Sequence, residues 1–228
     1  MTPSRTLTPE SESSARSQGS MPVVYVVDDD VSVRESLELL IRTEGWRPET
    51  FASAQEFLVM PRAVVPNCLI LDVSLPGING LELQERIAAE RTDMPIIFIT
   101  GHGDVPMTVK AMKKGAVEFL TKPFENDVLV NAIRQAIKRS EATLIRESEL
   151  QVLRTRYASL TNREREVMAL VVSGQLNKQI GSELGISEIT VKAHRGKAME
   201  KMKAESLAEL VNMAARLRIG RLPVAKHP

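Results

Sequence analysis

The sequence predicts two folded parts, an α/β doubly wound parallel sheet of the (βα)5 kind followed by an all-α helix-turn-helix domain. Two observations lead to this prediction. Up to residue 126, short apolar runs of strand length alternate with segments of helical period, as in parallel sheets that carry helices on both faces. After residue 157, short helical segments follow one another, several of them opened by Ser or Thr residues that suit helix N-caps.

The first part contains five strand and helix pairs. In order, we expect strand 23–27, helix 31–43, strand 48–51, a helix opened by Ser53 and Glu56, strand 68–72, helix 79–90, strand 95–100, helix 106–114, strand 117–121 and a helix from 126. Ser53 and Glu56 have the spacing of a capping box. Pro106 suits a first helical turn and Gly115 suits a helix C-cap.

The helix that begins near residue 126 is expected to run to residue 157, because no Gly or Pro interrupts this stretch. Its middle is polar and has two interpretations, a solvated helix or a coiled segment that carries a signal. We therefore expect a disordered tail (1–21), a sheet domain (22–140), a helical linker that continues its last helix (141–158), a helix-turn-helix domain (159–222) and a flexible tail (223–228).

Four short helices are predicted in the second part. Thr161 and Glu164 form a capping box before the first helix, and the second helix, 177–184, ends at Gly185. Ser187 caps the third helix, which runs to about 203, and a fourth helix follows. Two short helices joined by a turn of three or four residues that contains Gly make a helix-turn-helix.

Charge divides unevenly between the two parts. Residues 21–140 carry 13 Lys and Arg against 17 Asp and Glu, whereas residues 159–228 carry 12 against 7. This asymmetry suggests an acidic domain joined to one that binds nucleic acid. The single cysteine, Cys68, lies in a predicted buried strand, which favours a reduced, intracellular setting. Without a spanning stretch or signal sequence, we expect a cytoplasmic protein with no membrane partner.

Functional side chains follow four of the predicted strands, where the carboxyl ends of parallel strands meet. Asp28 and Asp29 follow the first strand, Asp72 ends the third, and Thr100 and Lys122 follow the fourth and fifth. Three neighbouring carboxylates need a cation, and Mg2+ suits oxygen ligands. Asp72 is the expected nucleophile toward a phosphoryl group, whose oxygens Thr100 and Lys122 would bind.

These motifs resemble the receiver domain of two-component response regulators. The motifs that carry the resemblance are Val27–Asp30, Leu71–Asp72 with Pro76–Gly77, Ile99–Asp104, Gly115–Ala116 and Phe119–Phe124. The resemblance covers about 21–140, and the run 100–107 is similar to the FixJ subgroup. It implies that Asp72 accepts a phosphoryl group from a sensor histidine kinase. It also implies that Asp29, Asp72 and the Ser74 carbonyl bind Mg2+, with Asp28 bound through water.

The resemblance also implies roles for residues around the acids. Phe119 would be an aromatic switch that turns inward with Thr100, and the Lys122–Pro123 peptide would be cis. A core position in its strand is the alternative interpretation of Phe119. Ser74 and His102 would flank the path of a hydrolytic water and set the lifetime of the phosphate, by orienting that water or by blocking it. Asp30 is expected to be an N-cap or a supporting acid.

Residues 159–220 resemble a LuxR-type helix-turn-helix. The matching motifs are Leu160–Val167, Gly174–Ile180, Glu183–Ser187 and Thr190–Arg195. Helical spacing independently predicts which face of the third helix is buried. Val191, Ala198 and Met202 should face the core, and the opposite face should enter the DNA major groove. That face carries Lys192, Ala193, Gly196 and Lys197.

The expected DNA contacts differ in kind. Lys192 can donate to guanine and Ala193 can touch a thymine methyl group, while Gly196 permits close approach or removes a base contact. Phosphate contacts are expected from Asn177, Lys178, Thr190 and Arg195. His194 is expected to be a packed, hydrogen-bonded side chain.

The favoured function is a phosphorylation-controlled transcription factor rather than an enzyme with other substrates. Its expected partners are a sensor histidine kinase, double-stranded DNA, RNA polymerase and, once phosphorylated, a second copy of the chain. One alternative is a phosphatase with an aspartyl nucleophile, which would carry an acid where Ser74 stands. Another is a ligand-sensing LuxR regulator, which would need an apolar pocket with aromatic walls.

Overall fold

A computed structural model describes residues 21–61, 63–88, 91, 93–101, 103 and 105–219 of the 228-residue chain. The chain divides into two compact units, one up to Leu144 and one from Ile145. Each unit has its own buried apolar core. No helix in these described ranges is both long enough and apolar enough to cross a membrane.

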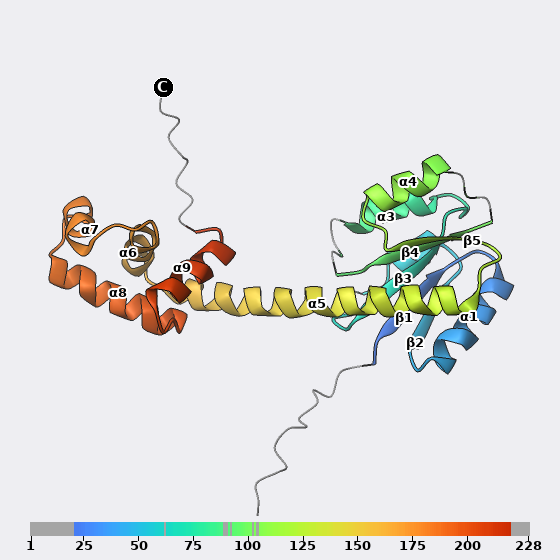
Figure 1. Cartoon of the computed structure of the whole chain (residues 1–228), viewed down its shortest axis with the longest axis horizontal. Helices are drawn as coiled ribbons and strands as arrows, with labels where there is room; N and C mark the ends of the chain where they lie inside the picture. The colour runs from blue at the N-terminus through green and yellow to red at the C-terminus, as the bar shows by residue number, and fades with distance from the viewer. Residues whose placement is uncertain are drawn as a thin grey trace, which may run out of the picture. The chain divides into compact units, whose positions relative to one another are not determined.

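A five-stranded parallel sheet organises the first unit (Figure 1), with strand order β2-β1-β3-β4-β5. The strands are β1 (Val23–Val27), β2 (Arg47–Phe51), β3 (Asn67–Asp72), β4 (Ile96–Thr100) and β5 (Glu118–Thr121). The helices are α1 (Val31–Thr43), α2 (Ala54–Leu58), α3 (Gly80–Ala88), α4 (Val105–Lys113) and α5 (Asn126–Ala158). The predicted doubly wound fold is confirmed.

Side chains of the central strands alternate between two cores. In β1, Val23, Tyr25 and Val27 belong to the core that includes residues of α2, α3 and α4. Val24 and Val26 belong to the core shared with α1 and α5. Because both faces are covered, the central strands β1, β3 and β4 are almost continuous apolar runs, and polar side chains gather where they end.

After α5, the described part of the second unit, which ends at residue 219, contains four short helices: α6 (Asn162–Val172), α7 (Asn177–Leu184), α8 (Glu188–Met202) and α9 (Leu207–Arg216). Thr161 and Glu164 form the predicted capping box, and Ser187 caps α8 through its side chain. Gly185 ends α7 with a φ of 65°, in the left-handed region where glycine is favoured. The helix-turn-helix architecture is therefore confirmed.

Residues of the last turns of α5 take part in the core of the second unit. Leu153 is buried there, and Tyr157 packs against the same cluster. Arg156 Nη1 donates to the Met202 carbonyl at the end of α8 over 3.3 Å. Lys201 Nζ donates to the buried Glu164 carboxylate over 2.7 Å. These contacts join the end of α8 to the last turns of α5 and to the first turn of α6.

Gly181 and Gly196 both lie inside helices of the second unit, but their surroundings differ. A Cβ atom on Gly181 would lie 2.7 Å from the Ile186 carbonyl oxygen, whereas one on Gly196 meets nothing within 4 Å. We expect Gly181→Ala to destabilise this unit by about 1–3 kcal/mol, because backbone must shift. Gly196→Ala should stabilise α8 by roughly 0.5–1 kcal/mol. Hydrogen exchange of peptides from 162–216 in the full-length protein measures both; equal protection in the two variants contradicts the prediction.

Candidate functional site

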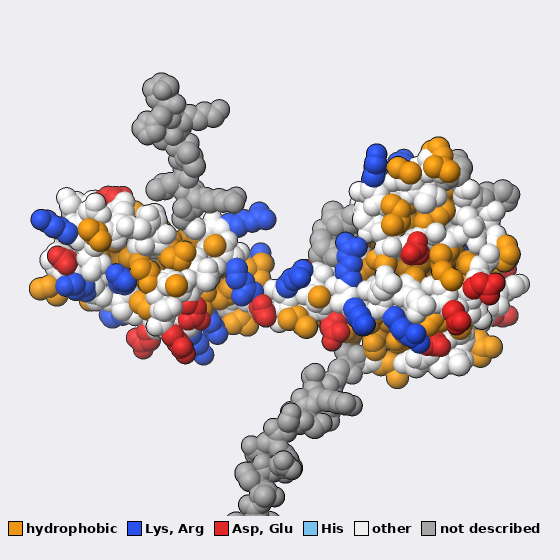
Figure 2. All heavy atoms as spheres, viewed as in Figure 1, with side chains coloured by type: hydrophobic (Ala, Val, Ile, Leu, Met, Phe, Trp, Pro, Cys, Tyr) orange, Lys and Arg blue, Asp and Glu red, His pale blue; other side chains and the backbone are white. Residues whose placement is uncertain are grey.

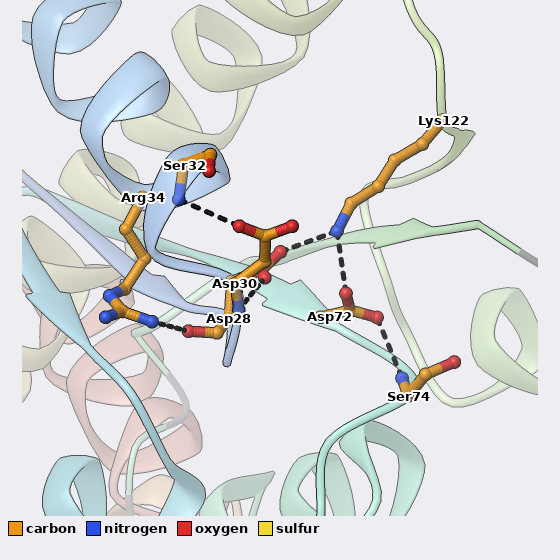
Figure 3. Close-up of polar contacts among 7 residues, drawn as sticks. All are labelled: Asp28, Asp30, Ser32, Arg34, Asp72, Ser74 and Lys122. Carbon is orange, nitrogen blue, oxygen red and sulfur yellow. Dashed lines mark hydrogen bonds and ion pairs between the residues drawn. The ribbon is translucent and has the colours of Figure 1, made fainter.

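Lys122 joins two carboxylates at the carboxyl edge of the sheet (Figure 3). Its Nζ atom lies 2.6 Å from Asp28 Oδ2 and 2.7 Å from Asp72 Oδ2. Asp28 is fully buried at the end of β1, and Asp72 is 6% exposed at the end of β3. β1 and β3 are neighbours in the sheet, so side chains far apart in the sequence meet at one place.

Backbone groups hold the second oxygen of each of these carboxylates. The Ser74 N–H donates to Asp72 Oδ1 over 2.8 Å, and the Asp30 N–H donates to Asp28 Oδ1 over 2.9 Å (Figure 3). Arg34 Nη1 also donates to the Asp28 carbonyl over 2.6 Å. The two carboxylates are therefore fixed in orientation before any ligand arrives.

Asp30 does not share the role of its two neighbours. Its carboxylate accepts a 2.8 Å hydrogen bond from the Ser32 N–H and so caps α1. That backbone hydrogen bond lowers the pKa of Asp30 below its usual range. Of the two roles expected for Asp30, the structure shows the N-cap.

Three aspartates form a possible metal site. One carboxylate oxygen from each of Asp28, Asp29 and Asp72 lies within 4.8 Å of the other two. Asp29 is exposed, so this oxygen set opens to solvent on one side. Hard oxygen donors that leave room for waters are the ligands that Mg2+ prefers, and the residues present fit this ion.

The charges of the pocket influence one another. Burial raises the pKa of Asp28, and hydrogen bonds from Lys122 and the Asp30 N–H offset this only in part. Burial lowers the pKa of Lys122, but its hydrogen bonds to Asp28 and Asp72 outweigh burial and raise that pKa. Lys122 therefore remains an ammonium ion and supplies the cation that two close carboxylates require.

Thr100, the last residue of β4, and Phe119, the second residue of β5, lie near each other. Thr100 is fully buried, and Phe119 is half-buried with its ring 6.1 Å from that of Phe98. A Cβ atom on Gly103 would lie 2.9 Å from Phe119 Cε1 and 3.2 Å from Thr100 Cγ2, so the backbone there is packed against both. Phe119 thus packs on the core while an edge of it stays accessible.

Two further expectations concern this edge of the sheet. The Lys122–Pro123 peptide is cis, as the resemblance implied. Ser74 is exposed beside Asp72. His102, the other residue expected to affect the lifetime of a phosphate, lies outside the described residues.

Removing the charge of Asp28 is expected to stabilise the metal-free protein. Because the folded protein holds the pKa of Asp28 above its unfolded value, stability is greatest while the carboxyl is protonated and falls as pH rises through the folded pKa. Asp28→Asn should remove this loss and keep an acceptor for the Asp30 N–H. Melting temperatures in EDTA over a pH series measure the effect; a variant less stable than wild type at neutral pH contradicts it.

The expected DNA-binding residues lie along α8 and at the start of α7. Lys178, Lys192, Ala193, Gly196 and Lys197 are exposed, whereas Asn177, Thr190 and Arg195 are half-buried. The three residues predicted to face the core, Val191, Ala198 and Met202, are fully buried. The predicted division of α8 into a buried face and an exposed face is therefore confirmed.

Several side chains of this surface contact one another. Arg195 Nη1 lies 3.5 Å from Asn177 Oδ1, which links α8 to α7. Lys192 Nζ lies 3.4 Å from Glu188 Oε1, one turn earlier. His194 is half-buried, which agrees with the expected packed side chain, and its Nδ1 atom has no hydrogen-bond partner in the described part of the chain.

Sequence reasoning missed two features near these residues, a side chain that supports the acidic pocket and an exposed apolar side chain on α8. Arg34 supports the Asp28 backbone from α1, and no local motif signals that contact. Ile189 is an exposed apolar side chain in the first turn of α8. Its position three residues before Lys192 could have placed it on the same helical face.

Two family models match the chain. Residues 24–134 match the response regulator receiver domain, and residues 158–214 match the bacterial regulatory proteins of the luxR family. The first match contains every acid of the pocket, and the second contains the whole of α8.

Curated relatives and solved structures match over both parts. Nodulation protein W of Bradyrhizobium diazoefficiens is 47% identical over 86% of this chain and 87% of its own length. The transcriptional regulatory protein FixJ of the same organism is 44% identical over 85% of this chain and 94% of its own length. The structure of the response regulator StyR matches 86% of this chain and 100% of its own, with 48% identity and a TM-score of 0.73.

With a receiver fold, an acidic pocket and a luxR-family helix-turn-helix in one chain, and with relatives that share both parts, this protein belongs to the response regulators that regulate transcription through a LuxR-type DNA-binding domain.

Proposed function

We propose that Asp72 accepts a phosphoryl group from the phosphohistidine of a sensor histidine kinase, and that phosphorylation promotes dimerisation and sequence-specific DNA binding. The observation that carries the proposal is the Lys122 ammonium held between Asp28 and Asp72. This contact supports the proposal, because a carboxylate beside a fixed cation at the carboxyl edge of the sheet is suited to accept a phosphoryl group.

The proposed transfer conserves atoms and charge. A carboxylate oxygen of Asp72 attacks phosphorus in line, the phosphorus–nitrogen bond of the phosphohistidine breaks, and the electron pair returns to the imidazole. Lys122 and the Thr100 hydroxyl would bind phosphoryl oxygens of the product. The Ser74 N–H keeps the carboxylate oriented during attack.

We propose that Asp29, Asp72 and the Ser74 carbonyl hold Mg2+, with Asp28 acting through a bound water. When bound, the ion would supply positive charge to offset that on the phosphoryl oxygens. Residues that act on a metal through its ligands or bound water typically affect metal affinity by about 10–100-fold, so Asp28→Asn should weaken Mg2+ binding by a similar factor. Calorimetric titration with Mg2+ measures this, and unchanged affinity would remove Asp28 from the site.

The surface of α4 supports a dimer as the output. Val105, Val109 and Met112 are exposed apolar side chains on this helix, and Figure 2 shows apolar side chains gathered over it. Thr100, which ends β4, and Phe119 in β5 both pack against Gly103, two residues before the start of α4. We propose that phosphorylation repositions these two side chains and favours pairing through this surface.

The proposed division of labour follows the expected boundaries. Residues 22–140 receive the phosphoryl group, residues 141–158 form a helical linker, and residues 159–222 bind double-stranded DNA and act on RNA polymerase.

A direct test incubates the full-length protein with Mg2+ and acetyl phosphate, a small phosphoryl donor. Intact mass spectrometry should show one added phosphoryl group in wild type and none in Asp72→Asn. Equal labelling of both proteins would overturn the assignment of Asp72.

A further inference from the structure

Ile189 is exposed to solvent to an unusual degree for its place in the fold. Its side chain is 80% exposed in the first turn of α8, while Val191, two residues later, is fully buried. Isolated exposed apolar residues are common on protein surfaces, so exposure alone assigns no role. The location of Ile189 on α8 is what points to a role.

Ile189 is exposed and belongs, by helical spacing, to the face of α8 that is proposed to enter the major groove. It precedes Lys192 by three residues, Ala193 by four and Gly196 by seven, and these spacings place side chains on one face of a helix. It also lies in the N-terminal turn, the part of a recognition helix that contacts base edges. This stripe, formed by Ile189, Lys192, Ala193 and Gly196, therefore begins with an apolar side chain.

The first turn of α8 holds Ile189 in a defined position. Ser187 Oγ accepts a 3.1 Å hydrogen bond from the Thr190 N–H and lies 2.8 Å from the Thr190 hydroxyl. These contacts fix the backbone on both sides of Ile189. A β-branched side chain on a fixed backbone has few rotamers to lose, which lowers the entropic cost of a contact.

We propose that Ile189 is a further specificity-determining residue, which packs against the C5-methyl group of a thymine in the operator. This inference rests on the proposed DNA-binding function. Isoleucine has no hydrogen-bond donor or acceptor, and the thymine methyl is the apolar group that base edges present in the major groove. Ala193 and Gly196 add little bulk to the same stripe, and Gly196 has open space around it, so the helix can approach the bases closely.

Ile189 and Ala193 would read different base pairs. Four residues along a helix correspond to a rise of about 6 Å, whereas base pairs are stacked about 3.4 Å apart. We therefore expect Ile189 and Ala193 to contact different thymines. Each half-site should contain a thymine whose importance depends on Ile189 alone.

The test replaces thymine by deoxyuridine, which lacks only the methyl group. An operator is first selected from random DNA with full-length protein activated by Mg2+ and beryllium fluoride, and each thymine of one half-site is then replaced in turn. At one position, wild type should lose about fourfold in affinity, the value of one buried methyl group, and Ile189→Ala should lose nothing. Leu176→Ala, which alters another exposed apolar residue outside α8, should keep the full wild-type dependence.

The outcomes separate this inference from the proposed function. If wild type enriches no sequence, sequence-specific DNA binding fails and the inference fails with it. If an operator is found but every uridine substitution affects Ile189→Ala as much as wild type, only the role of Ile189 is overturned. If Ile189→Ala keeps the wild-type dependence on every thymine methyl but supports less transcription by purified RNA polymerase, the role of Ile189 in reading thymine is also overturned. That result would assign Ile189 to a polymerase contact.

Discussion

Asp72→Asn is expected to abolish the change in oligomeric state that activation produces in wild type. With Mg2+ and beryllium fluoride, a phosphoryl mimic, wild type should shift from monomer to dimer in light scattering. Asparagine has nearly the same shape, but its uncharged amide cannot bond to the beryllium as a carboxylate does, nor balance the charges of Lys122 and Mg2+. The variant should therefore have one size with or without the mimic.

Asp30→Asn is the matched control for this experiment. Asp30 lies in the same run of acids, but its carboxylate accepts a hydrogen bond from the Ser32 N–H and caps α1. Asparagine caps helices as well as aspartate does, so the variant should dimerise like wild type. If wild type and Asp72→Asn have equal size in every condition, dimerisation is not the output. Control would then lie in masking of the DNA-binding unit or in a dimer that is always present.

Local sequence rules predicted the elements well because each rule describes neighbours in the chain. The capping box of Thr161 and Glu164 and the cap at Ser187 are formed by residues three apart, so their spacing is visible in the sequence. Contacts between distant segments leave no such trace. The Ser140 hydroxyl accepts a 3.1 Å hydrogen bond from the Asn67 N–H, 73 positions away, and no periodicity predicts that pair.

The same limit applies to the acidic pocket. Parallel topology brings strand ends to one edge, which is why Asp28, Asp72 and Lys122 could be expected together. Topology does not say which oxygen each group contacts, so the bridge formed by Lys122 and the support of Asp28 by Arg34 emerge only from the packed structure. Exposure likewise depends on neighbours, which is why Ile189 was not expected to stand out.

Lys192→Ala is expected to change which sequence the protein prefers, whereas Lys178→Ala should weaken binding to all sequences. Lys192 lies on the exposed face of α8 and can donate to a guanine. Losing that contact should cost about 1–3 kcal/mol at one base pair and remove discrimination there. Lys178, at the start of α7, is expected to contact phosphate, so its loss should make the negative slope of log affinity against log salt shallower by about one.

Glu188 provides a third substitution for this experiment, because its carboxylate forms an ion pair with Lys192 in the free protein. The two side chains lie 3.4 Å apart and both are largely exposed, so the ion pair is weak and can open when DNA arrives. Glu188→Gln should therefore strengthen binding to any sequence and leave the preferred base unchanged, since it removes a negative charge near the phosphates. Binding curves for the operator and its single-base variants at several salt concentrations measure all three substitutions. If Lys192→Ala weakens binding equally for every base at every position, Lys192 contacts phosphate and the base must be read by other residues of the stripe.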